Sequence, residues 1–241
     1  MNILIVGDSL SSCGGFDDPT GKIWYSMIPQ TNITNLSIGG QCNTKIYIKT
    51  ISELIKNPTN YDLIVVQWSS LFRISFNQGR TIHDNQTSFN LAHPGKKFKR
   101  FQQLWRNNFI NPRVELLEWL TQITSLATLL KSYNQNFVFI KAFNNFLPNL
   151  EHADWRNCSR DFLELVLNLS GLPDEDITKY YNELRTVYLA MKTVSCQHWL
   201  NLHTPDWTQS ATDHADDQSH PGVNSHKIYF EDFIKKIVLT T

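Results

Sequence analysis

The stretch that decides the fold is Asn2-Ile3-Leu4-Ile5-Val6, which runs directly into Gly7-Asp8-Ser9. An apolar run of this length, closed by small and polar residues, predicts a short buried strand that ends at a turn. A second run, Tyr61 to Trp68, contains the continuously apolar Leu63-Ile64-Val65-Val66. Such continuity is typical of a strand buried on both faces of a parallel sheet. Ser9 is therefore expected where the chain leaves a buried parallel strand.

Further strands and helices alternate along the rest of the chain. The sequence predicts strands over 32–38 and 137–140, and helices over 23–28, 43–56, 112–130, 176–194 and from 221 onward. Asn111-Pro112 is a favourable helix start, with asparagine as the cap and proline at the first helical position. This alternation indicates an α/β fold with a mostly parallel sheet covered on both faces. The length of 241 residues suits one domain over 1–241.

Composition excludes several classes of protein. Hydrophobic residues at 41% and aromatic residues at 12% are too abundant for a disordered chain. The net charge of zero and the pI near 7.1 argue against a nucleic-acid partner. The four cysteines form no C-x-x-C pair, and no apolar run is long enough to span a bilayer. With no room for a leader before Gly7, we expect a cytoplasmic protein without a membrane partner.

The segment 69–110 is expected to be a long insertion without a clear strand or helix. Between Asn85 and Val114 it carries six basic residues and no acid, together with five large aromatic rings. One interpretation is a solvated basic loop whose rings pack against the core. The other is a substrate-facing insertion that suits an anionic or carbohydrate ligand through charge and ring stacking. Both interpretations stay open at the level of the sequence.

Two motifs at opposite ends of the chain carry the chemistry. Ser9 follows the first strand, and ligands of open parallel sheets bind outside the carboxyl ends of the strands. A serine hydroxyl becomes a nucleophile when a base removes its proton. In Asp217-Gln218-Ser219-His220-Pro221 the spacing lets Asp217 accept the Nδ1 proton of His220, which leaves Nε2 as a base toward Ser9. The pattern predicts a Ser-His-Asp triad.

These motifs resemble the SGNH (GDSL) hydrolases. Gly7-Asp8-Ser9-Leu10 follows the first strand, Asp217-x-x-His220-Pro221 precedes the last helix, and Asn35 to Gly40 matches the family's glycine block after the second strand. The resemblance spans the whole chain in order and spacing. It implies a flavodoxin-like three-layer α/β/α sandwich of about five parallel strands, the fifth near 199–203. It also implies an oxyanion hole from the backbone N–H groups of Ser9 and Gly40.

The activity that the resemblance implies is hydrolysis of a small acyl ester through a serine acyl-enzyme. An O-acetyl group on a carbohydrate is the favoured substrate, because the family often acts there and the insertion is aromatic. The expected partner is thus a small-molecule or glycan ester, with no cofactor and with an undetermined oligomeric state.

The family's third block, Gly-x-Asn-Asp after the third strand, is not matched. The corresponding run is Gln67 to Arg73, where Leu71 falls near the asparagine position and cannot donate a hydrogen bond. Losing one oxyanion donor costs a hydrolase on the order of 10²–10³ in rate, so an active enzyme needs a substitute. Ser69, Ser70, Arg73 and Asn43 are candidates by position, with Ser70 and Asn43 ranked first. Candidate substrate contacts are Asp8, Trp68, Arg73 and Trp105.

Other assignments are weaker. His214, His220 and His226 recur every six residues, which places them on no common helix face, so no metal site is expected. His226 is expected to pack on or beside the last helix, and Asp213 and Asp216 are alternative carboxylate partners for His220.

Other classes of function lack their motifs or stay open. The chain has no Gly-x-Ser-x-Gly elbow, phosphate-binding loop or dinucleotide fingerprint. An O-acyltransferase on the same fold and a catalytically weak carbohydrate-binding protein stay open as alternatives, the second because the third block is broken.

Overall fold

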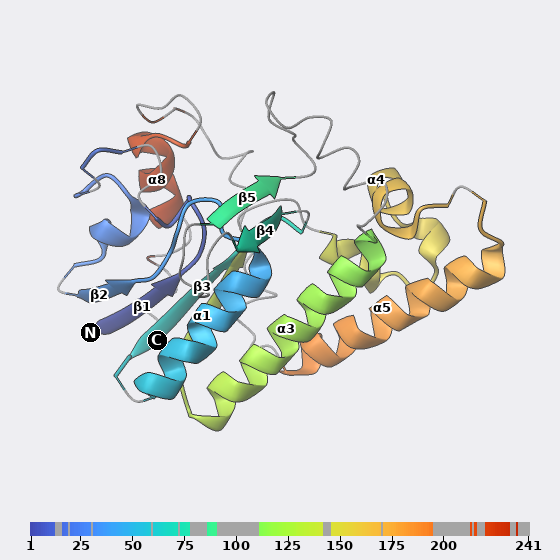
Figure 1. Ribbon diagram of the computed structural model, residues 1–241, viewed down its shortest axis with the longest axis horizontal. Coiled ribbons are helices and arrows are strands. Elements are labelled where there is room, and N and C mark those ends of the chain that lie inside the picture. The colour runs from blue at the N-terminus through green and yellow to red at the C-terminus, as the bar shows by residue number, and fades with distance from the viewer. Residues whose placement is uncertain are drawn as a thin grey trace.

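The computed structural model describes residues 1–12, 16–18, 20–29, 31–58, 60–71, 73–77, 86–90, 111–141, 146–169, 171–194, 213, 215, 220–231 and 235. Its centre is a parallel sheet whose strands in the described part follow the order β2-β1-β3-β6. Figure 1 shows β2, β1 and β3 of this sheet. The strands are β1 (Asn2–Val6), β2 (Asn32–Asn35), β3 (Leu63–Trp68) and β6 (Phe137–Lys141). All three pairings are parallel, with Ile5 opposite both Asn35 and Val65.

One face of the sheet is covered by three long helices. They are α1 (Asn43–Lys56), α3 (Pro112–Ser132) and α5 (Asp174–Val194), with α3 lying between the other two (Figure 1). Shorter turns fill the region between β6 and α5: η3 (Leu147–Glu151), η4 (Trp155–Asn157), α4 (Arg160–Phe162) and η5 (Leu163–Leu167). Asn111 caps α3 by accepting a hydrogen bond from the Arg113 N–H at 3.1 Å, as the sequence predicted.

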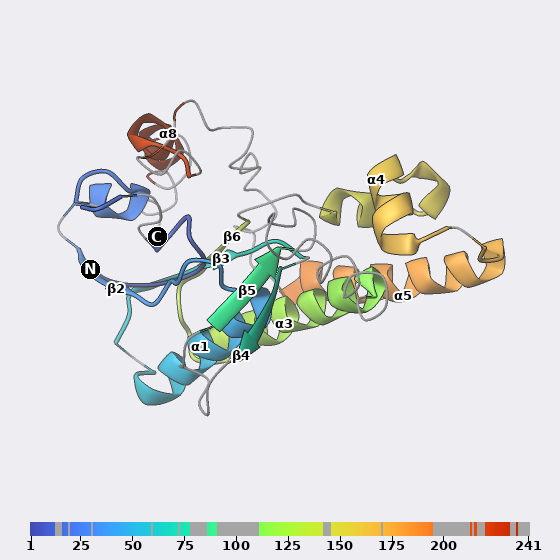
Figure 2. The ribbon, with the colours of Figure 1, turned by 45° about the horizontal axis from the view of Figure 1, so that its top comes forward.

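The opposite face is covered by η1 (Trp24–Met27) and α8 (Val223–Tyr229) (Figure 2). Trp24 packs edge-on against Tyr229 at 6.2 Å between ring centroids, which joins the two elements. Alternate strand residues separate the two layers: Leu4 faces the long helices and Ile3 faces η1 and α8. The described elements therefore confirm the expected three-layer α/β/α arrangement. The expected fifth strand, near 199–203, lies outside the described residues.

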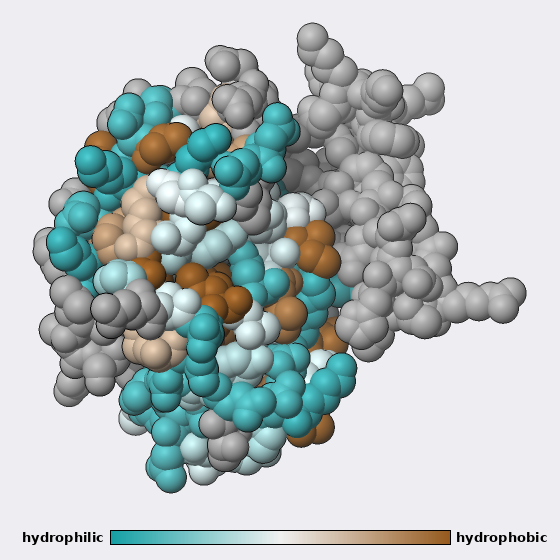
Figure 3. Space-filling view, turned by 90° about the vertical axis from the view of Figure 1, so that its left-hand side faces the viewer, coloured by the Kyte–Doolittle hydropathy of each residue, from teal (hydrophilic) through white to brown (hydrophobic). Residues whose placement is uncertain are grey.

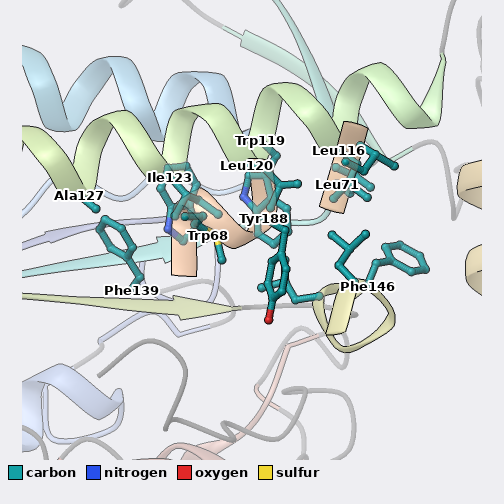
Figure 4. Close-up of a cluster of buried hydrophobic side chains, with 14 of the residues drawn as sticks. Trp68, Leu71, Leu116, Trp119, Leu120, Ile123, Ala127, Phe139, Phe146 and Tyr188 are labelled. Atoms are coloured by element: carbon teal, nitrogen blue, oxygen red, sulfur yellow. The ribbon is translucent and has the colours of Figure 1, made fainter. Parts of the chain in front are cut away.

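The larger core lies between the sheet and the long helices. Trp68 has no exposed surface and meets Phe139 edge-on at 5.7 Å between centroids. Leu71, directly beyond β3, is also buried in this cluster. Figure 4 shows these side chains gathered beneath α3, near Leu116, Leu120 and Ile123. The segment that leaves β3 is thus anchored in the apolar core.

The segment 69–110 corrects one expectation. It contains two strands, β4 (Arg73–Asn77) and β5 (Gln86–Asn90), which pair antiparallel with Arg73 opposite Asn90. The expectation that this segment lacks a strand is therefore wrong. The alternation of apolar and polar residues that favours a strand is present in β4, whereas β5 has Phe89 as its one apolar residue. Among the other predicted elements in the described part, 2–6 and 43–56 have the predicted bounds, 23–28 forms a 3-10 helix over Trp24–Met27, and the remaining ones are present with shifted ends.

The surface and the helices add two observations. The face that carries β2 is mainly hydrophilic, with apolar areas separated from one another (Figure 3). Across the part of the chain that the structure describes, no helix combines the length and apolar character needed to cross a bilayer.

Candidate active site

Ser9 lies in a tight turn at the carboxyl end of β1. The Ser11 N–H donates to the Asp8 carbonyl at 3.1 Å, and the Leu10 N–H donates to the Asp8 carboxylate at 3.1 Å. Ser9 itself is only 9% exposed. The turn therefore places the hydroxyl-bearing residue at the sheet edge where parallel α/β folds bind ligands.

Gly7 allows this turn to sit close to β3. A Cβ atom at Gly7 would lie 2.8 Å from the Gln67 Cβ and 2.9 Å from its Oε1. Gln67 is buried and accepts a hydrogen bond from the Ser11 hydroxyl. Only glycine leaves room for this approach, which explains on steric grounds why the Gly-Asp-Ser motif begins with glycine. The role of Gln67 could not be predicted from the local sequence, because it depends on how β3 lies beside the turn after β1.

Gly39 and Gly40, the glycines that follow the second strand, lie in a turn directly beside Ser9. The Gln41 N–H donates to the Ile38 carbonyl at 3.2 Å, and Gly40 has a φ of +79°, a conformation that favours glycine. A Cβ atom built on Gly39 would lie 3.9 Å from the Ser9 Cβ. The structure thus brings together the Gly7–Leu10 motif and the Gly39-Gly40 motif, two of the matches on which the resemblance rests.

Asp8 is the centre of a buried polar network. Its carboxylate accepts hydrogen bonds from the Ser69 hydroxyl at 2.7 Å and from Arg73 Nη1 at 3.1 Å. Burial raises the pKa of Asp8, while the Arg73 charge, the Ser69 hydroxyl, the Leu10 N–H and the His220 charge each act to lower it. Asp8, the residue before Ser9, therefore holds in place the segment that follows β3 and carries Ser69 and Arg73.

Asn43 fastens the same segment from the start of α1. Its Oδ1 accepts from the Ser69 N–H at 2.7 Å, and its Nδ2 donates to the carbonyls of Ser69 and Ser70 at 3.2 and 3.4 Å. This amide is engaged with the backbone of the segment. The structure gives Asn43 a structural role in holding this segment, and as oxyanion donors Ser69, Ser70, Arg73 and Asn43 stay predictions.

His220 stands just before α8, in a loop that closes on itself. The Ala215 N–H donates to the His220 carbonyl at 2.9 Å, and the Gly222 N–H donates to the Asp213 carbonyl at 3.0 Å. The His220 charge is the smallest of the influences that lower the pKa of Asp8. Asp217, the expected third member of the triad, lies outside the described residues, as does Asp216.

The Asp213 carboxylate is hydrogen-bonded to the first turn of α8. Its carboxylate accepts from the Asn224 N–H at 2.9 Å, the Ser225 N–H at 2.8 Å and the Ser225 hydroxyl at 2.5 Å. Backbone and side-chain donors together lower the pKa of Asp213 against the opposing effect of burial. Asp213, a candidate partner of His220 by sequence, is therefore the group that caps α8, the helix that follows His220.

His226 packs within α8, as the sequence analysis expected. It is 1% exposed, and its ring lies 5.7 Å from that of Phe16. Burial lowers the pKa of His226 to about 4, with the His220 charge acting in the same direction and Asp213 opposing. His226 is thus a neutral packing residue near neutral pH. Among the described residues, no group of three or more His, Cys, Asp or Glu residues could hold a metal ion.

Two of the expected substrate contacts need correction. Trp68 and Asp8 have no exposed surface, Trp68 because it faces the core under α3 and Asp8 because its carboxylate is enclosed by its partners. Neither side chain is open to a ligand. Arg73 keeps 12% of its side chain exposed, and Ser70 is half-buried. Trp105 lies outside the described residues.

Comparisons with known proteins gave matches among solved structures. No family model matches the chain, and no curated protein matches it. The chain is similar to the psychrotrophic esterase EstA from Pseudoalteromonas sp., with 13% identity, a TM-score of 0.49, and coverage of 99% of this chain and 98% of that one. It is also similar to a catalytic mutant of Axe2, an acetylxylan esterase from Geobacillus stearothermophilus (14%, 0.45, 98% and 93%).

A third similar structure is a member of the lipolytic protein G-D-S-L family from Veillonella parvula, with 11% identity and a TM-score of 0.43. That similarity covers 98% of this chain and 97% of the other. All these TM-scores lie below 0.5, so the function proposed below rests on the residues and motifs of this chain.

Proposed function

We propose that the protein is a serine ester hydrolase of the SGNH type, with Ser9 as nucleophile, His220 as base and Asp217 as the carboxylate that orients the imidazole. The observation that carries this proposal is the setting of Ser9. It lies at the carboxyl end of β1 and beside the Gly39-Gly40 turn. The motifs and their order along the chain support the same roles.

The reaction follows from these roles. His220 Nε2 accepts the hydroxyl proton while Ser9 Oγ attacks the ester carbonyl carbon, and the backbone N–H groups of Ser9 and Gly40 stabilise the oxyanion. The tetrahedral intermediate expels the alcohol, which takes the proton from His220. Water then attacks the acyl-enzyme with His220 again as base, releasing the acid and restoring Ser9. The proposed substrate is a small acyl ester, with an O-acetyl group on a carbohydrate as the favoured class.

A covalent probe tests the proposal directly. An organophosphonate should label Ser9, as read by mass spectrometry of the digested protein, and hydrolysis of p-nitrophenyl acetate should stop with labelling. Ser9→Ala should abolish both signals, whereas the control Ser26→Ala, a serine of η1, should retain both. Labelling of Ser9→Ala at the original rate, or its unchanged activity, would remove Ser9 from the mechanism.

Burial of Leu71 favours a second candidate function. The position expected to hold the third oxyanion donor is occupied by a side chain 8% exposed in the apolar core. A protein that binds a carbohydrate ester and turns it over weakly would fit this loss. The two candidates differ in the rate of the phosphonate reaction: an ester hydrolase is labelled rapidly at Ser9, whereas a catalytically weak binding protein is labelled slowly and incompletely. If labelling succeeds, product analysis with a glycan acceptor separates hydrolysis from acyl transfer.

A further inference from the structure

A buried polar connection runs from α1 to the turn that carries Gly40. The Lys49 ammonium donates to the Leu36 carbonyl at 3.1 Å, just beyond β2. With its amide oriented to satisfy both neighbours, Gln41 accepts from Lys49 Nζ at 3.0 Å and donates from Nε2 to the Gly7 carbonyl at 2.7 Å. Gln41 is 1% exposed. The chain of contacts therefore links α1, the end of β2 and the residue after β1.

The same Gly7 carbonyl receives a second hydrogen bond from the turn. The Ile38 N–H donates to it at 3.2 Å, while the Gln41 N–H closes the turn on the Ile38 carbonyl at 3.2 Å. The turn is thus fixed at both of its ends, by the Ile38 backbone and by the Gln41 side chain. Between these ends stand Gly39, which lies beside Ser9, and Gly40 with its positive φ.

We propose that Lys49 and Gln41 are positioning residues that hold the Gly40 N–H in place for oxyanion stabilisation. The proposal rests on the ester hydrolase function proposed above. A left-handed glycine has several accessible conformations, so its N–H keeps one direction only if the flanking residues are held. Lys49 connects α1 to both sides of the turn, through Leu36 and Gln41. Gln41 in turn connects the turn to Gly7, directly after β1.

The environment of Lys49 agrees with such a role. Burial, with a smaller effect of the nearby Lys45 charge, lowers the pKa of Lys49 to about 8. An amine that is desolvated and still directed at two oxygen acceptors is held by the protein. Both acceptors, Leu36 O and Gln41 Oε1, flank the turn on which the proposed oxyanion site depends.

The test is a set of substitutions with kinetics on p-nitrophenyl acetate. Lys49→Met and Gln41→Leu each keep much of the side-chain volume and remove the connection. A small displacement of an oxyanion donor costs up to about a hundredfold, so we expect kcat to fall about ten- to a hundredfold with KM within about twofold. The double variant should be no slower than the slower single variant, because both changes break one connection. Lys49→Arg, which keeps the charge and the donors, should recover most of the rate.

The control is Lys56→Met, which removes an exposed lysine from the last turn of the same helix and should keep the wild-type kcat. Unchanged kcat in both Lys49→Met and Gln41→Leu would overturn the proposal, as would strictly additive losses. If one variant fails to fold, as judged by circular dichroism, the other still decides. Phosphonate labelling separates the two levels of inference. Absence of Ser9 labelling in the wild type rejects the proposed function, whereas wild-type labelling rates in folded Lys49 and Gln41 variants reject only the positioning role.

Discussion

The two halves of the candidate site are held by different physical means. The Ser9 half stands on the ends of central strands, where the buried Asp8 carboxylate binds Ser69 and Arg73. The His220 half stands before the seven-residue helix α8, which is held by the Asp213 cap and by ring contacts such as Trp24–Tyr229. A buried charge pair resists disruption strongly once formed, whereas a cap and a small aromatic cluster contribute less. We therefore expect the Ser9 half to be the more robust of the two.

The largest expected effect tests the Ser9 half. Arg73→Met removes the cationic partner of the buried Asp8, and breaking such a pair typically costs about 3–5 kcal/mol of unfolding free energy. Without Arg73 the pKa of Asp8 should rise further, because burial is then opposed only by the weaker effects of Ser69, the Leu10 N–H and the His220 charge. The loss measured by urea denaturation should therefore shrink toward acidic pH, where Asp8 is protonated. A loss that does not depend on pH would show that Arg73 acts through packing alone.

The next effect tests the His220 half through acid. His226 has a folded pKa of about 4, below the ordinary value of 6.5, so the unfolded chain binds more protons between these values. Stability should thus fall as pH drops from about 6.5 to 4, by up to about 3 kcal/mol for a shift of this size. His226→Phe keeps the ring beside Phe16 and should flatten this acid limb in urea titrations. An equally steep limb in the variant would assign it to other groups.

A smaller loss should follow from crowding at the start of the motif. Gly7→Ala places a methyl group against Gln67, whose Cβ cannot move without its strand. Overpacking of this kind costs about 1–3 kcal/mol. Gly39→Ala is the matched control, because a Cβ atom there meets its nearest neighbours at 3.8 and 3.9 Å, an ordinary contact distance. Equal thermal midpoints for the two variants would contradict the steric account of Gly7.

The smallest effect concerns the cap of α8. Asp213→Ala removes the acceptor for three donors and should cost about 1 kcal/mol, while Asp213→Asn keeps an acceptor oxygen and should lose less. Because the cap also fixes the His220 loop, kcat should fall more than stability alone explains. A kcat unchanged in a folded Asp213→Ala would show that the His220 loop does not need this anchor.

Local patterns predicted what depends on neighbours in sequence. The apolar run of β1, the glycines of the Ile38–Gln41 turn and the Asn111 cap each stand beside the feature they specify. Trp68 was misassigned although alternation places it on the same face as Val66, toward the long helices. The hairpin of β4 and β5 was missed because its polar strands carry little apolar content.

The polar connections of the site are of another kind. Asn43 binds residues 26 and 27 positions away, and Asp8 binds Ser69 and Arg73 across 61 and 65 positions. No local pattern in one sequence indicates such pairs, because each requires the strands to be arranged first. The fold was therefore largely predictable, whereas the roles of Asn43, Gln67 and Asp213 were not.

Burial of Leu71 has a consequence for how this sequence can change. Placing at this position the asparagine of the SGNH hydrolases that the chain resembles would be a single substitution, but it would set an amide among the apolar side chains beneath α3. The variant would be less stable, and its buried amide would not be accessible to a substrate. An additional oxyanion donor would therefore require either a different backbone path after β3 or a donor side chain from another segment. The packing of Leu71 therefore makes an asparagine donor hard to introduce at this position.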